Sequence, residues 1–96
     1  MPVFVVLGKL TRFAIRNIGE AAERDKKAEQ VIKAAGGKLL ANYYTLGRYD
    51  FVVIIDLPSH EALVKALIEI GTWGSISTET MTTMLPEEFY KATKGL

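Results

Sequence analysis

Two short runs of the sequence contain no polar residue, and they constrain the fold more than any other feature. The runs are Val3–Leu7 and Phe51–Ile55. A strand that is apolar on both sides has to be covered on both faces, so we expect these runs to be neighbouring central strands of one sheet. Two other strand-like runs, Leu39–Leu46 and Ser75–Met84, mix apolar with polar side chains and are expected at the edges.

Helical periodicity predicts two main helices between these strands. Glu20–Ala35 has apolar residues at helical spacing and a charged solvent side that includes Arg24 and Glu29. The second helix is expected to begin after Ser59, a favourable N-cap residue, and to run to about Ile70. Two shorter helical segments are also expected, around Phe13–Ile18 and over Glu87–Thr93.

The predicted order is therefore strand, helix, strand, strand, helix, strand. Right-handed crossovers bring the first and third strands together, which gives an α+β, ferredoxin-like βαββαβ domain over residues 1–96 with an antiparallel four-stranded sheet. Both helices then cover the same face. Either Phe4 and Val6 or Val5 and Leu7 remain on the open face, which a second sheet packed about 10 Å away would cover. We expect a homodimeric α/β barrel or a higher homo-oligomer.

Composition excludes several classes of partner and site. The 96 residues carry 12 Lys and Arg against 11 Asp and Glu, scattered along the chain, so we expect no nucleic-acid partner. The absence of cysteine excludes disulfides and thiolate metal sites. No apolar run approaches the roughly 20 residues of a membrane span, and no signal-peptide pattern precedes the first strand. We therefore expect no membrane partner and a cytoplasmic location.

His60 is the only histidine, and it follows Ser59 in what should be the exposed first turn of a helix. A metal or catalytic role would need further converging ligands or acids, and only Asp56 and Glu61 are near it in sequence. A haem would need an axial ligand in a covered site. We expect neither a metal nor a cofactor.

The densest polar chemistry lies in the turn Gly47-Arg48-Tyr49-Asp50 between two predicted strands. Gly47 is expected to have a positive φ in this tight connection. In a structural interpretation, Asp50 bonds backbone N–H groups and Tyr49 packs its ring on the end of the sheet. In a functional interpretation, Arg48 holds an anionic ligand or a partner carboxylate, and Asp50 orients it or acts as a base.

Four short pieces in a fixed order resemble the GYD-domain family of small dimeric α/β-barrel proteins. They are Val5-Val6-Leu7-Gly8-Lys9, Ile15-Arg16-Asn17-Ile18, the Gly-x-Tyr-Asp turn within Tyr44–Asp50, and Thr78-Glu79-Thr80. The resemblance covers nearly the whole chain and implies the fold, whereas the family has no firmly assigned activity. Related folds of the superfamily include cofactor-independent monooxygenases, lactone isomerases, haem proteins and effector-binding domains of transcription regulators.

Further candidates lie outside the turn. Glu79 either pairs with a lysine, Lys9 of its own sheet or Lys38 of a partner, or occupies a pocket as a proton-transfer group. Four residues either line a pocket between the sheet and the helices or lie at a subunit interface: Asn17, Tyr43, Tyr44 and Trp73. Gly8 is expected at a bulge or beneath a closely approaching group.

The sequence thus predicts a homo-oligomeric domain that binds a small organic molecule or serves in assembly. One alternative is a cofactor-independent oxygenase or isomerase that uses Asp50, Glu79, Tyr44 or His60. Another is a stand-alone effector-sensing module, so whether the chain is an enzyme stays open. The candidate ligand-binding residues are Asn17, Tyr44, Arg48, Tyr49, Asp50 and Glu79.

Overall fold

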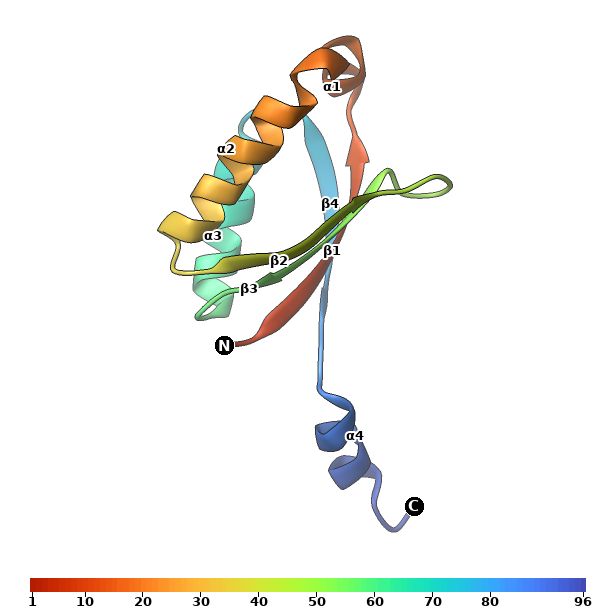
Figure 1. Ribbon diagram of the computed structural model, residues 1–96. Coiled ribbons are helices and arrows are strands. Elements are labelled where there is room, and N and C mark those ends of the chain that lie inside the picture. Colours follow the sequence, from red (N-terminus) through yellow and green to blue (C-terminus); the bar gives the residue numbers. More distant parts are fainter.

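A four-stranded antiparallel sheet with two long helices on one face forms the body of the protein (Figure 1). The computed structural model describes all residues, 1–96. In chain order the elements are β1 Val3–Leu10, α1 Arg12–Arg16, the 3-10 turn η1 Ile18–Glu20, α2 Ala21–Ala34, β2 Lys38–Tyr44, β3 Phe51–Asp56, α3 His60–Gly71, β4 Ile76–Thr82 and α4 Pro86–Thr93.

The strands lie in the order β2-β3-β1-β4, so the two wholly apolar strands β1 and β3 are central as predicted. Their antiparallel register pairs Phe4 with Ile55 and Val5 with Ile54. The mixed strands β2 and β4 form the two edges. The ferredoxin-like βαββαβ arrangement is confirmed.

The side-chain alternation of β1 decides which residues face the helices. Phe4 and Val6 are buried in a core that includes Ile55 from β3, Ile32 from α2 and Leu63 from α3. Their neighbours along the strands point to the other side of the sheet, because successive strand residues face opposite ways. We call this side the open face; it carries Val5, Leu7, Val52, Ile54 and Met81, with Ala41 and Tyr43 beside them on β2.

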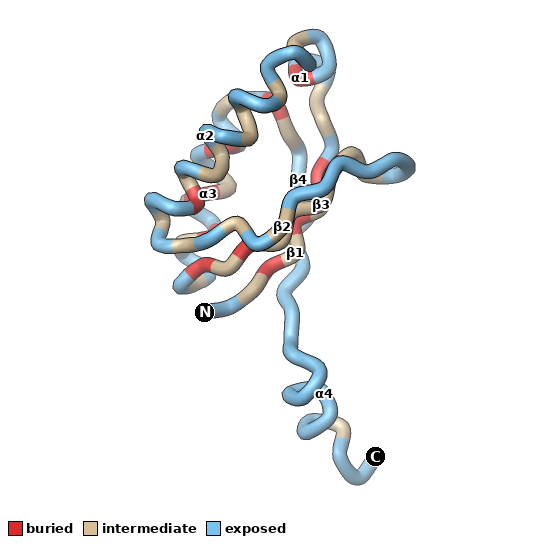
Figure 2. The backbone as a smooth tube through the Cα atoms, in the orientation of Figure 1, coloured by how far each residue is buried: buried red, intermediate tan, exposed pale blue.

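No element of the chain covers the open face. Figure 2 shows buried positions on the central strands and on α1, α2 and α3, while most of the remaining backbone is exposed or half-buried. Of the two possibilities that the sequence left open, the structure therefore selects Val5 and Leu7 as the uncovered pair.

Gly8 lies under an aromatic ring, which explains the glycine in an otherwise bulky strand. It pairs with Phe51 in the β1–β3 register, and a Cβ atom on it would lie 1.9 Å from Cζ of that ring. No side chain can replace the hydrogen there without moving the ring. The expected close approach is confirmed, and it places Phe51 across the sheet on the helix side.

Hydroxyl caps fix the start of two helices. Thr11 Oγ1 accepts a hydrogen bond from the Ala14 N–H at 3.3 Å at the start of α1. Ser59 Oγ accepts one from the Ala62 N–H at 3.1 Å at the start of α3, as predicted. Each bond satisfies a backbone donor that has no partner within the helix.

The β2–β3 connection is longer than the sequence predicted. Strand β2 ends at Tyr44 rather than at Leu46, because the Thr45 N–H turns back to the Asp50 carbonyl oxygen at 2.8 Å and closes a loop. Leu46 projects fully into solvent from this loop. Gly47 has a φ of 114°, which confirms the expected positive value.

Two further sequence expectations are wrong in detail. The short helical segment expected around Phe13–Ile18 ends earlier, because α1 ends at Arg16 and the exposed Ile18 lies in the separate 3-10 turn η1. The last strand was expected to reach Met84, yet β4 ends at Thr82 and the chain leaves the sheet.

None of the helices is both long and apolar enough to cross a membrane.

The last residues form an arm that leaves the body. Figure 1 shows the chain running on from the end of β4 in an extended stretch to α4, well away from the sheet and from α2 and α3. The radius of gyration is 14.9 Å, whereas a compact domain of 96 residues has one of about 12.5 Å. The arm makes the molecule elongated, with principal extents of 53 × 31 × 17 Å.

Candidate functional site

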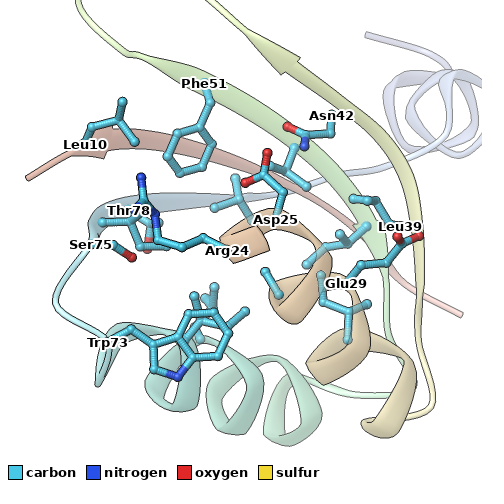
Figure 3. Close-up of a pocket in the computed structure, with 18 of the residues that line it drawn as sticks. Leu10, Arg24, Asp25, Glu29, Leu39, Asn42, Phe51, Trp73, Ser75 and Thr78 are labelled. Carbon is cyan, nitrogen blue, oxygen red and sulfur yellow. The ribbon is translucent and has the colours of Figure 1, made fainter. Parts of the chain in front are cut away.

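A cavity of about 90 Å³ lies between the sheet and the helices α2 and α3; we call it the hollow. Figure 3 shows Phe51 and Leu10 toward one end of the hollow and Trp73 at the other. Most of its lining is apolar, from β1, β3, α2, α3 and the start of β4: Val6, Leu10, Ala28, Ile32, Phe51, Val53, Leu67, Ile70 and Ile76. The hollow borders the core cluster that contains Phe4 and Leu63, and Ile32 and Ile55 belong to both.

One wall of the hollow is polar and contains an acid. The Tyr44 hydroxyl of β2 donates a hydrogen bond to Asp25 Oδ2 of α2 at 2.6 Å. This bond links an edge strand to the helix above it. Asn42 also lines this wall, and Tyr44 remains 53% exposed, so the polar wall of the hollow reaches the surface.

The pKa of Tyr44 reflects this environment. Partial burial, followed by the hydrogen bond to Asp25 and the charge of that carboxylate, raises the pKa of Tyr44 to about 12. All three effects disfavour a phenolate next to a carboxylate. Tyr44 is therefore a hydrogen-bond donor throughout the physiological pH range rather than a base.

Arg24 lines the hollow but its guanidinium is already occupied. Nη1 donates to the Asn17 carbonyl oxygen at 3.0 Å and Nη2 donates to the Ala14 carbonyl oxygen at 3.3 Å. Glu20 lies 3.9 Å from Nη1, and the Arg24 side chain is only 15% exposed. Arg24 thus ties α2 to the α1 corner, whereas the carboxylate of the next residue, Asp25, can accept further hydrogen bonds.

A second polar cluster lies at one end of the open face. The Tyr49 hydroxyl donates a short hydrogen bond to Glu79 Oε2, and Lys9 Nζ lies 5.7 Å from the centre of the Tyr49 ring. The hydrogen bond to Glu79 is the main cause of a raised pKa for Tyr49. Glu79 therefore bonds a tyrosine, and Lys9 lies over the ring of that tyrosine instead of pairing with the acid.

Asp50 is held by the backbone of β1. Its N–H donates to the Gly8 carbonyl oxygen at 2.8 Å, and its Oδ2 accepts from the Leu10 N–H, also at 2.8 Å. The carboxylate thereby extends the β1–β3 ladder by one bond beyond Phe51. Its partner is a strand 40 positions away in sequence, not the local turn, and Arg48 forms no ion pair with it.

The remaining predicted residues lie apart from the hollow. Asn17 Nδ2 donates to the Phe13 carbonyl oxygen at 2.9 Å and so closes the end of α1. Tyr43 points to the open face, opposite Val52. His60 is exposed at the start of α3, with its ring edge-on to Phe4 at 5.4 Å.

The structure therefore divides the predicted residues between three places. Tyr44 and Trp73 line the hollow; Tyr49 and Glu79 meet on the open face; Asn17, Arg48 and Asp50 lie in loops or helix ends. Neither Asp50 nor Glu79 lines the hollow, so the two acids predicted for proton transfer do not meet there.

Sequence reasoning missed Asp25 and assigned Arg24 and Glu29 to the solvent side of the helix, which is wrong because both line the hollow. A signal for Asp25 was available. The residue follows Ala21 by four positions and precedes Ala28 by three, so it lies within the apolar stripe of the helix. A carboxylate in such a stripe marks a helix face that does not close onto the sheet.

Comparison with known proteins places these features in a family. Residues 4–93 match the GYD domain. A Thermus thermophilus protein described as a glutamine synthetase and cystathionine beta-lyase binding protein is 30% identical over 82 residues, which covers 84% of this chain and 86% of that protein.

Two solved structures share the fold. The structure described as MtbAldR superposes with a TM-score of 0.66 at 13% identity over 88% of this chain, which spans about half, 52%, of that chain. The structure described as FFRP-DM1 superposes with a TM-score of 0.60 at 20% identity over 88% of this chain and 100% of its own. Similarity at these identities concerns the fold alone.

The geometry around Asp50 predicts a structural role that mutation can separate from ligand binding. Asp50→Ala leaves the Leu10 N–H without an acceptor and should lower the free energy of unfolding by about 1–3 kcal/mol. Asp50→Asn keeps an acceptor oxygen and should cost less. Denaturant unfolding measures both, and amide hydrogen exchange at Leu10 should be faster in the alanine variant.

Arg48→Ala is the matched control, because this exposed side chain in the same loop has no ion-pair partner. It should change the free energy of unfolding by less than about 0.5 kcal/mol. Unchanged stability and unchanged exchange at Leu10 in Asp50→Ala would contradict the anchoring role.

Proposed function

The chain belongs to the GYD domain family, and on that basis we propose that it is a self-associating domain that binds a small organic molecule in the hollow. Its family and its Thermus relative, which is described as a binding protein, support a role as a small binding or assembly domain. One observation carries the ligand-binding part of the proposal. An apolar cavity of about 90 Å³ has, on one wall, a carboxylate with unused bonding capacity.

The lining of the hollow favours a particular class of ligand. Asp25 accepts one hydrogen bond, from Tyr44, and its Oδ1 has no partner in the protein. The Arg24 guanidinium, which could have attracted an anion, already donates hydrogen bonds to backbone carbonyl oxygens. The ligand class that fits is a small molecule with an apolar body and an amine or other donor at one end, since apolar walls supply affinity and a few polar groups supply orientation.

Titration with three molecules of similar size tests this ligand class: isobutylamine, isobutanol and isobutyrate. Trp73 is the only tryptophan and lines the hollow, so its fluorescence reports occupancy. We expect saturable binding of the amine that is at least about tenfold tighter than that of the acid, because only the amine can pair with Asp25.

Two variants serve as controls. Asp25→Asn should remove the preference for the amine, whereas Glu87→Gln, on the distant arm, should leave it unchanged. A stronger response to isobutyrate than to isobutylamine would overturn the ligand class, and no saturable response to any of the three would overturn the ligand-binding part of the proposal.

The open face supports self-association. A compact monomer of 10.6 kDa has an accessible surface of about 5,500 Å², whereas this chain exposes 6814 Å². The surplus of about 1,300 Å², to which the open face and the extended arm both contribute, exceeds the roughly 800 Å² that each partner contributes to a standard interface. Stacking two open faces would cover the apolar row around Leu7 and Ile54 and close the α/β barrel expected from the sequence.

An unpaired acid at the margin of the open face supports the same proposal. Asp56 Oδ1 is buried by its neighbours yet has no hydrogen-bond partner within the chain. Asp56 pairs with Val3 in the sheet register and so shares the side of the sheet that carries Val5 and Leu7. Buried carboxylate oxygens are nearly always bonded, and a second copy on this face would bring further donors.

Light scattering at micromolar concentration tests self-association. We expect a mass of at least twice 10.6 kDa. Leu7→Lys places a charge in the centre of the open face and should give monomers, because the ammonium would lose its water in the interface. Val64→Lys, on the exposed outer side of α3, is the matched control and should keep the wild-type mass. A monomeric wild-type chain contradicts self-association.

A protein partner is a second candidate, supported by the outer side of α3. Val64 and Ile68, one helical turn apart, are 57% and 66% exposed and form an apolar pair facing away from the sheet. Exposed apolar side chains four positions apart on a helix have the spacing with which helices bind in the apolar groove of a partner protein. The Thermus relative is described as a binding protein for two enzymes. In this second candidate function, the chain is a stand-alone module that binds an enzyme through α3 and a small molecule in the hollow.

Biolayer interferometry with purified Thermus thermophilus glutamine synthetase and cystathionine beta-lyase tests this candidate. We expect at least one to bind, and the double variant Val64→Ser/Ile68→Ser to bind about tenfold more weakly, because two apolar contacts are lost. Lys65→Gln, an exposed polar change on the same helix, should bind like wild type. Binding of neither enzyme, or equal binding of the double variant, would exclude this surface.

A further inference from the structure

The arm after β4 carries an apolar stripe that the body of its own chain leaves uncovered. Its members recur at helical spacing along α4 and its ends: Leu85, Phe89, Ala92 and Leu96. Leu85 and Phe89 are 60% and 55% exposed, and the last side-chain bond to the body lies before them, from Thr83 Oγ1 to the Val3 carbonyl oxygen. Figure 1 shows α4 separated from every other element.

A helix of this length is not stable by itself. Helix α4 has 8 residues, whereas isolated helices shorter than about 12–15 residues are marginal in water. Its own bonds are local, such as those of the Thr93 hydroxyl to the Phe89 and Tyr90 carbonyl oxygens. The apolar stripe therefore has to be covered for α4 to persist, and the body of the same chain does not cover it.

We infer that the arm packs against a second copy of this chain and clasps the dimer. The inference rests on the proposed stacking of two open faces. Strand β4 borders the open face and continues directly into the arm, so a copy seated on that face lies beside the point where the arm departs. The arm also contributes to the accessible surface by which this chain exceeds a compact monomer of the same mass.

The first test asks which copy the arm touches. Full-length chains with the photoreactive p-benzoylphenylalanine in place of Phe89 are made in ¹⁵N-labelled and unlabelled form, mixed and irradiated. Mass spectrometry then identifies the linked peptides. Links between a labelled arm and an unlabelled body are expected. Links confined to single copies would overturn the inference, as would the absence of links to the body.

The second test measures the strength of the dimer. The double variant Leu85→Ser/Phe89→Ser should raise the dimer dissociation constant about 30-fold or more in analytical ultracentrifugation, because two large side chains lose their cover. Glu88→Gln, an exposed change on the same helix, is the matched control and should keep the wild-type constant. An unchanged constant in the double variant would overturn the clasp.

These outcomes separate the two proposals. If Leu7→Lys disrupts the wild-type dimer but Leu85→Ser/Phe89→Ser leaves its dissociation constant unchanged, the stacking of the open faces is supported and the clasp is wrong. A wild-type chain that is monomeric at every concentration rejects both, since no second copy is then bound.

Discussion

Everything in this structure depends on the pairing of β1 with β3. Both strands are apolar on both sides, so covering one face of the pair leaves an apolar row on the other face. On one side, Phe4, Val6 and Ile55 meet α2 and α3 and form the core. On the other side, the row around Leu7 and Ile54 remains open. The same pairing thus creates the core of the domain and the surface that we propose as the dimer interface.

Environment gives two aspartates of the chain different roles. Asp50 bonds the Leu10 N–H and completes a strand ladder, so its carboxylate is used for architecture. Asp25 lies where α2 leaves a hollow above the sheet, and one of its oxygens is free for a ligand. Tyr44 stays protonated beside it because a phenolate next to this acid is unfavourable. The hollow is therefore suited to the binding and orientation of a ligand that we propose.

How far sequence reasoning reached depended on the range of the interactions. Strand order, the capping role of Ser59 and the close contact at Gly8 were predictable, because periodicity, capping and the missing side chain act locally or in register. The wall formed by Tyr44 and Asp25 was missed because its residues lie 19 positions apart and meet only when α2 crosses β2. Tyr49 and Glu79, 30 positions apart, became partners for the same reason.

The sequence by itself determined the class of the fold and the apolar character of both faces of the central strands, since hydrophobic burial depends on which residues are apolar and how they are spaced. Only the tertiary structure decided that Phe4 and Val6 face inward while Val5 and Leu7 face outward, because period-two alternation is symmetric until helices pack on one side. It also decided that the arm after β4 leaves the body. That choice depends on where the sheet ends and on which surfaces remain uncovered.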